Sequence, residues 1–114
     1  MSLAAMLALL SLSGAQAAPD SPLPYEGVVR CAGLTQAASE LEGGESNDGR
    51  ALYDAALYWS LTATQAAAAM GRNAALAETE QTRARIRAVR ELSADNADAR
   101  AELQRCRARA PRLG

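Results

Sequence analysis

The chain of 114 residues contains no histidine, no lysine and no phenylalanine. Without histidine it has no Ser-His-Asp triad, no haem attachment motif of the C-x-x-C-H kind and no histidine-rich metal site. Without lysine it has no Schiff-base chemistry and no phosphate-loop lysine. The two cysteines, Cys31 and Cys106, stand too far apart for a C-x-x-C redox motif. We therefore expect a protein that is not an enzyme and takes no cofactor.

The acidic residues do not supply another kind of site. Pairs such as Glu78 and Glu80 stand at i, i+2 and diverge around a helix, so they cannot meet over a substrate. The glycine-rich segment EGGESNDG (42–49) fails the EF-hand pattern, because Gly44 falls on the first ligand position and Ala55 on the twelfth. The sequence predicts no metal site and a loop between helices here.

The first residues have the pattern of a secretory signal peptide. An apolar run at 3–12 is followed by Ala15 and Ala17, which form an A-x-A cleavage signal, although no Lys or Arg precedes the run. We expect residues 1–17 to be removed; an uncleaved anchor and an ordinary helix are the alternatives, and the run is too short to span a bilayer. An oxidising compartment would pair Cys31 with Cys106. Because all 12 basic residues are arginine, a GC-rich genome is indicated, and we expect a periplasmic or secreted protein of a Gram-negative bacterium.

The composition favours an all-α fold with a thin core. Alanine, the best helix former, accounts for 28 residues, whereas the aromatic residues are three tyrosines and one tryptophan. A buried alanine removes little apolar area from water, so a domain of this size needs an additional cross-link. A disulfide between Cys31 and Cys106 would supply it.

Periodicity and helix-breaking segments predict four helices, at residues 26–41, 49–70, 74–92 and 96–110. After the signal peptide, residues 18–25 form a flexible proline-rich lead, 26–110 a helical bundle domain and 111–114 a tail. Short connections favour a small antiparallel bundle of three to four helices, with an up-down-up-down order. Alternatively the second and third helices form a long hairpin with the shorter pair packed across it. Either arrangement brings the two cysteines together.

Each predicted helix has an apolar stripe that we expect to face the core. The second helix carries two apolar rows. The first is a heptad seam formed by Leu52, Ala56, Trp59, Ala63, Ala66 and Met70. The second row widens this apolar face and consists of Tyr53, Leu57 and Leu61. In the others the stripes are Cys31, Thr35, Ala38 and Leu41; Ala75, Thr79, Thr82, Ile86 and Val89; and Ala99, Leu103, Cys106 and Ala110. Asp54 and Gln65 argue against a membrane span in the second helix.

Charge is divided unevenly along the mature chain. Residues 18–70 carry seven acids and two arginines, and residues 71–114 carry six acids and ten arginines. The plain interpretation is a solvated face with local i, i+3 pairs, Glu80 with Arg83 and Glu102 with Arg105, plus attraction between the two halves. The alternative is an arginine face for an anionic envelope component, such as outer-membrane lipid, peptidoglycan or an acidic protein. That face would comprise Arg83, Arg87, Arg90, Arg105 and Arg109.

We expect an exported helical protein, monomeric or homodimeric, with a non-catalytic interaction or structural role. A second hypothesis is a carrier of an apolar ligand or lipid in a cavity between helices near Trp59. Tyr53, Tyr58 and Trp59 are then the candidate ligand or interface anchors. A third hypothesis is an envelope protein that is anchored by its uncleaved N-terminal segment. Among the three hypotheses, only this one involves contact with a membrane. Nucleic acid is not an expected partner, because no aromatic residues are interleaved among the arginines.

Overall fold

The computed structural model describes residues 22–111, which contain four α-helices and no strand. They are α2 (Tyr25–Glu42), α3 (Asn47–Ala69), α4 (Ala74–Ser93) and α5 (Ala97–Arg109). Each bound lies within two residues of the predicted one, which confirms the all-α class. The predicted signal peptide, residues 1–17, lies outside the described residues.

Side-chain caps and glycines define the helix ends. The Ser46 hydroxyl accepts from the Gly49 amide at 2.9 Å, and the side chains of Asn73 and Asn96 cap α4 and α5 in the same way. Gly43 ends α2 with a φ of +84°, a conformation that strains most other residues. These local signals explain why the boundaries can be predicted from sequence.

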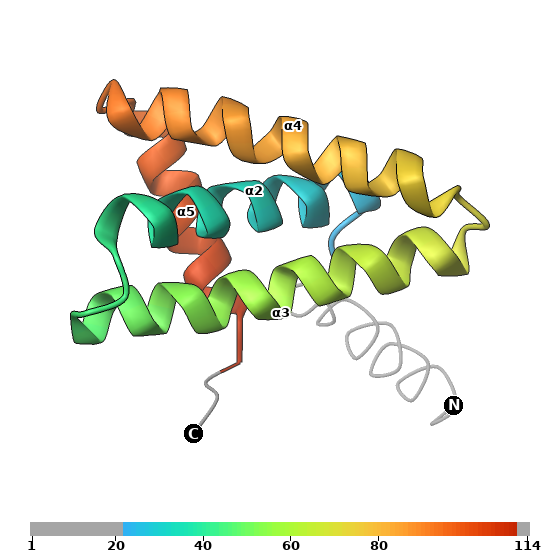
Figure 1. Ribbon diagram of the computed structural model, residues 1–114, viewed down its shortest axis with the longest axis horizontal. Coiled ribbons are helices and arrows are strands. Elements are labelled where there is room, and N and C mark those ends of the chain that lie inside the picture. Colours follow the sequence, from blue (N-terminus) through green and yellow to red (C-terminus); the bar gives the residue numbers. More distant parts are fainter. Residues whose placement is uncertain (1–21, 112–114) are drawn as a thin grey trace, which may run out of the picture.

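Helix α2 occupies the centre of the fold. It lies between α3 and α4, which contact each other far less than either contacts α2 (Figure 1). Helix α3 runs antiparallel to α2 and to α4 (Figure 1). Ten of the 18 residues of α2 are buried, more than in any other helix.

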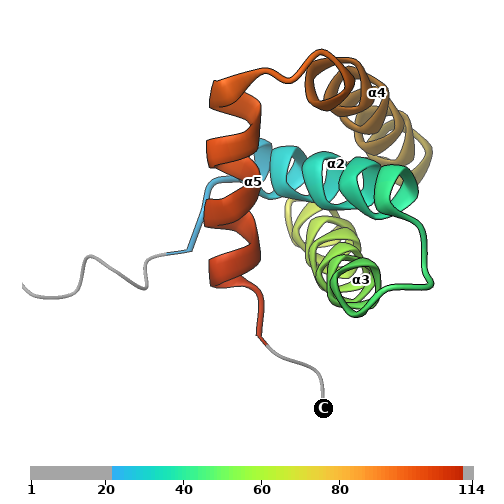
Figure 2. The ribbon, with the colours of Figure 1, turned by 90° about the vertical axis from the view of Figure 1, so that its left-hand side faces the viewer.

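The up-down-up-down order is wrong for the last helix. Helix α5 crosses α2 steeply, from the side of α4 to the side of α3, instead of lying along its neighbours (Figure 2). With 13 residues it buries only Ala99, Leu103 and Cys106. Such a short buried stripe can cover one patch of α2 but not its length. Asp95, with a φ of +61°, makes the sharp turn that redirects the chain.

Small residues let α2 and α4 approach closely. A Cβ added to Gly33 would lie 2.6 Å from the backbone carbonyl carbon of Ala84, so only glycine fits this crossing point. The inner face of α4 is accordingly built on Ala77, Ala84 and Ala88. Packing density here comes from close approach of the backbones rather than from large side chains.

The predicted apolar stripe of α4 is therefore wrong. Ala75, Thr79, Thr82 and Ile86 are exposed, and only Val89 packs partly against the core. The branched side chain of Ile86 could not fit where the helix backbones nearly touch. A row of alanines occupies that position instead, and Ile86 is 40% exposed.

The second apolar row of α3 also differs from the prediction. The seam from Leu52 to Ala63 is buried, with Trp59 only 4% exposed, whereas Met70 at its end is exposed. Tyr53, Leu57 and Leu61 are exposed by 55%, 49% and 60%. They point away from α2, because α4 and α5 both pack elsewhere. Leu41, at the end of the stripe predicted for α2, is likewise exposed.

No helix within residues 22–111 is both long and apolar enough to cross a membrane. Helix α3, with 23 residues, is long enough for a span but is not apolar enough. At the start of the described chain, Leu23 packs against the core and Tyr25 is buried.

Candidate functional site

A disulfide joins the two ends of the domain. The sulfur atoms of Cys31 and Cys106 lie 2.08 Å apart, and the two residues are separated by 75 positions in the sequence. Cys31 lies in the second turn of α2 and Cys106 in the last turn of α5, and both are buried. The predicted pairing is confirmed. Because α5 has few other buried residues, this bond is its main attachment to α2.

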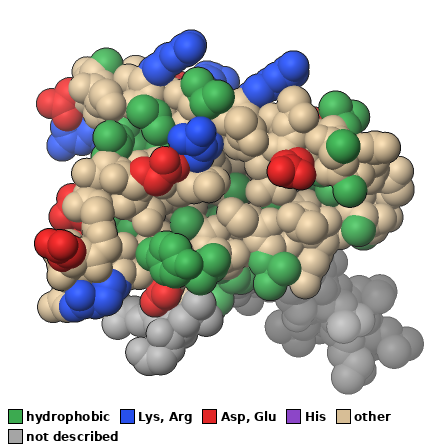
Figure 3. Space-filling view, viewed as in Figure 1, with side chains coloured by type: hydrophobic (Ala, Val, Ile, Leu, Met, Phe, Trp, Pro, Cys, Tyr) green, Lys and Arg blue, Asp and Glu red, His purple; other side chains and the backbone are tan. Residues whose placement is uncertain are grey.

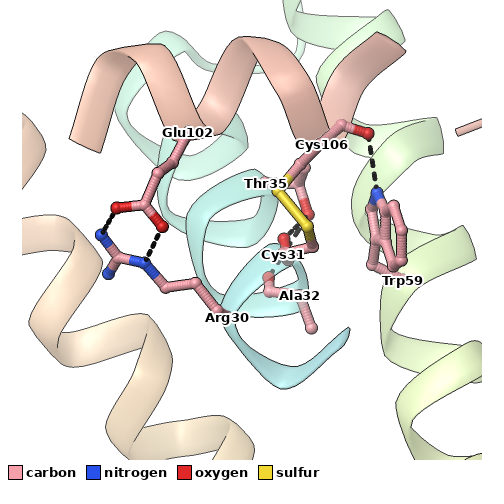
Figure 4. Close-up of a disulfide and its surroundings, with 7 residues drawn as sticks. All are labelled: Arg30, Cys31, Ala32, Thr35, Trp59, Glu102 and Cys106. Atoms are coloured by element: carbon pink, nitrogen blue, oxygen red, sulfur yellow. Dashed lines mark hydrogen bonds and ion pairs between the residues drawn. A yellow bond between two sulfur atoms is a disulfide. The ribbon is translucent and has the colours of Figure 1, made fainter. Parts of the chain in front are cut away.

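The disulfide is connected to α3 through Trp59. Its indole Nε1 donates a hydrogen bond to the backbone carbonyl of Cys106 at 3.0 Å (Figure 4). On the other side, the Thr35 hydroxyl donates to the carbonyl of Cys31 at 2.7 Å. Both groups are buried, so these bonds avoid the cost of unpaired polar atoms. Three helices therefore meet at one cross-linked, hydrogen-bonded centre.

An ion-pair cluster lies beside the disulfide. Arg30 donates to both carboxylate oxygens of Glu102, at 3.0 and 3.1 Å, and to Glu91 at 2.6 Å. The hydrogen bond from Arg30 is the main cause that lowers the pKa of Glu102, and the same bond raises the pKa of Arg30. The cluster joins α2, α4 and α5 through one bidentate and one single contact.

Helical spacing did not predict this cluster, because it pairs Glu102 with Arg105 instead. The nearest signal in the sequence is that Arg30 stands next to Cys31, while Glu102 lies one helical turn before Cys106. The disulfide between these cysteines therefore brings Glu102 close to Arg30. No periodicity reports a contact between residues so distant in the chain.

A second polar cluster surrounds the start of α2. The Tyr25 hydroxyl donates to Glu80 at 3.1 Å, and the Arg72 guanidinium lies 4.8 Å from the Tyr25 ring centre. Arg72 also pairs with Glu80 at 3.6 Å. Burial is the largest cause that raises the pKa of Tyr25. Glu80 thus contacts Tyr25 and Arg72, whereas i, i+3 spacing predicted a pair with Arg83. The cluster anchors the start of α2 to the α3–α4 connection.

The five arginines of the predicted anionic-partner face are all exposed. They do not lie together around a single groove. Arg83 and Arg87 line a small groove between α2 and α4. Arg87 also forms an ion pair with Glu91 at 3.4 Å. Arg109 lines a different groove, beside Trp59. Basic side chains gather along α4 (Figure 3), the helix that carries Arg83, Arg87 and Arg90.

Two of the three predicted aromatic anchors lie together. Tyr58 and Trp59 meet edge to face, with ring centres 5.1 Å apart. They line an open groove of about 660 Å³, whose wall also includes Leu23, Val28 and Ala66. Tyr53 lies outside this groove, on the exposed side of α3.

The exposed side of α3 forms a continuous uncharged surface. We name it the α3 outer face and define it by five exposed residues on one side of the helix: Tyr53, Leu57, Leu61, Thr64 and Ala68. No charged residue occurs from position 55 to 70. Periodicity predicted that its bulky members would be buried, because a helix that is apolar on most sides does not reveal which side is covered.

Within residues 22–111, no group of three or more metal-ligating side chains lies close enough together to hold a metal ion. No protein-family model, curated protein or solved structure matches this chain.

Proposed function

We propose that this chain is an exported, disulfide-linked helical protein that acts by binding another macromolecule through the α3 outer face, without catalysis. The observation that carries the proposal is the exposure of Tyr53, Leu57 and Leu61 in one row. A soluble domain rarely leaves three large apolar side chains side by side on a helix unless a partner covers them. Single exposed apolar residues would need no such explanation.

Export rests on the first residues and the cysteines. The apolar run and A-x-A signal at 15–17 have the pattern that signal peptidases cut. A buried disulfide that holds the last helix in place fits an oxidising compartment. Mass spectrometry of the protein recovered from the periplasm tests this part. We expect a chain that begins at Ala18 and contains linked Cys31 and Cys106; an intact N-terminus or two free thiols would contradict it.

The binding role can be tested by site-specific photo-cross-linking in the producing cell. A photoreactive residue at position 57 should give a cross-linked adduct to another macromolecule, because the α3 outer face is covered there. The matched control places the same residue at position 76, since Leu76 is also an exposed leucine, 48% exposed, but lies on α4. No adduct at position 57, or equal adducts at both positions, would overturn the proposal.

The groove beside Trp59 supports a second candidate function, a carrier of an apolar ligand. Its volume, about 660 Å³, lies within the range of small-molecule sites, and its wall combines Tyr58 and Trp59 with aliphatic residues. Titration with oleate, followed by Trp59 fluorescence, tests it. A saturable change that Ala66→Arg abolishes is expected of a carrier. An unchanged spectrum would remove this candidate and leave the interaction role unaffected.

A further inference from the structure

The α3 outer face has two unlike halves. Its first half is bulky, with Tyr53, Leu57 and Leu61 exposed by about half or more. Its second half is small, with Thr64 and Ala68 in the same row. A surface of this kind is not complementary to itself when two copies run parallel, because bulky meets bulky and small meets small.

We infer that the partner of the α3 outer face is a second copy of this chain, packed antiparallel about a two-fold axis near residues 60 and 61. This inference rests on the proposed function, whose surface it uses. In that arrangement Tyr53 of one copy lies over Ala68 of the other, and Leu57 lies over Thr64. Large side chains then fill the space above small ones on either side of the axis, and the two copies of Leu61 meet near the axis itself. A two-fold axis also satisfies both copies with a single surface.

Charge at the two ends of α3 agrees with this direction. The last turn of α3 contains no basic residue. Arg72 follows just beyond it, but its guanidinium is paired with Glu80 and lies over the Tyr25 ring, so an added cation would still be favourable at this carbonyl end. Arg50 is exposed near the start of α3, where its guanidinium contacts the Glu45 carbonyl and the Asn47 side chain. The antiparallel arrangement carries Arg50 to the carbonyl end of the second copy's α3, at Gly71. A parallel arrangement would place it at another amino end.

The size of the contact limits its strength. Helix α3 has 23 residues, which corresponds to a length of about 34 Å. At a helix width of about 10 Å, the contact buries roughly 700 Å² of surface, summed over both copies. This is below the range of stable, specific interfaces. The dimer should therefore dissociate on dilution.

Sedimentation equilibrium of the purified oxidised chain tests the inference over a hundredfold range of concentration. We expect the average mass to rise from one chain toward two, and Leu57→Arg to abolish the rise. Leu76→Arg is the matched control and should leave it unchanged. Circular dichroism and the mapped disulfide confirm that both variants are folded. A constant mass of one chain, or equal association of both variants, would overturn the inference.

Direction is tested by adding one cysteine. Leu61→Cys lies near the axis and should form a covalent dimer under mild oxidation, whereas Ala68→Cys should not, because its two copies lie about 22 Å apart along the helices. Equal cross-linking of both variants would refute the antiparallel arrangement. If the adduct at position 57 contains a different macromolecule, the second copy is ruled out as partner and the proposed interaction role stands.

Discussion

Removal of the disulfide should cost this domain a large part of its free energy of unfolding. The perturbation is the double variant Cys31→Ala, Cys106→Ala, which leaves no unpaired thiol or hydroxyl in the buried site. The bond connects residues 75 positions apart. In the chain-entropy treatment, a loop of this length raises the free energy of unfolding by about 4 kcal/mol. Small domains have a total of about 5–15 kcal/mol.

The structure gives a reason to expect the full effect. Alanine forms much of the core, so few large side chains compensate for the lost cross-link. Helix α5 depends on the bond more than the other helices, since its other buried residues are only Ala99 and Leu103. We therefore expect α5 to detach first and the midpoint of thermal unfolding to fall by roughly 15–30 °C.

Urea unfolding followed by Trp59 fluorescence measures the effect. Trp59 is buried and donates to the carbonyl of Cys106, so its emission should shift to the red when α5 separates from α3. The reduced wild-type chain is the control, because it keeps both sulfur atoms and loses only the covalent link. A loss below about 1 kcal/mol in both proteins would refute the entropy argument. A loss in the double variant alone would show that sulfur packing, not the cross-link, stabilises the domain.

Three other substitutions test local features. Gly33→Ala should lower the free energy of unfolding by about 1–3 kcal/mol, because its Cβ meets the α4 backbone, whereas Gly44→Ala, with open space around it, should change it little in the same urea titration. Ser46→Ala should cost about 1 kcal/mol through loss of the α3 cap, measured by thermal unfolding. Glu102→Gln should reduce the free energy of unfolding at neutral pH. The pKa of Glu102 is lowered in the folded state, so the stabilisation from its carboxylate is fully present above the ordinary pKa of 4.5. That stabilisation is lost as the pH falls through the lower pKa of the folded state. Wild type should therefore lose more stability than Glu102→Gln on acidification, and parallel pH curves would contradict a role for the contact with Arg30.

The sequence predicts the helices because their signals are local. Caps such as Asn73 and breaks such as Gly43 act on the residues next to them, and their effect does not depend on the tertiary fold. The disulfide partners are also predictable, since a chain with two cysteines has only one possible intramolecular pairing. Periodicity correctly assigned the seam around Trp59 to the core.

Other features were decided by the way the helices pack. The inner face of α4 carries alanines because Gly33 draws α2 and α4 together, a consequence of two residues that are far apart in sequence. The partner of Arg30 follows from the steep crossing of α5, which no pattern within a single helix reports.

Local propensity and the presence of only two cysteines thus determined the elements and their covalent link from the sequence alone. Which side of α3 meets solvent was settled only by tertiary packing, because that helix is apolar around most of its circumference. Where α2 packs against one side, the opposite row from Tyr53 to Ala68 remains exposed. The surface to which we assign the function is the one that helical periodicity could not distinguish from the core.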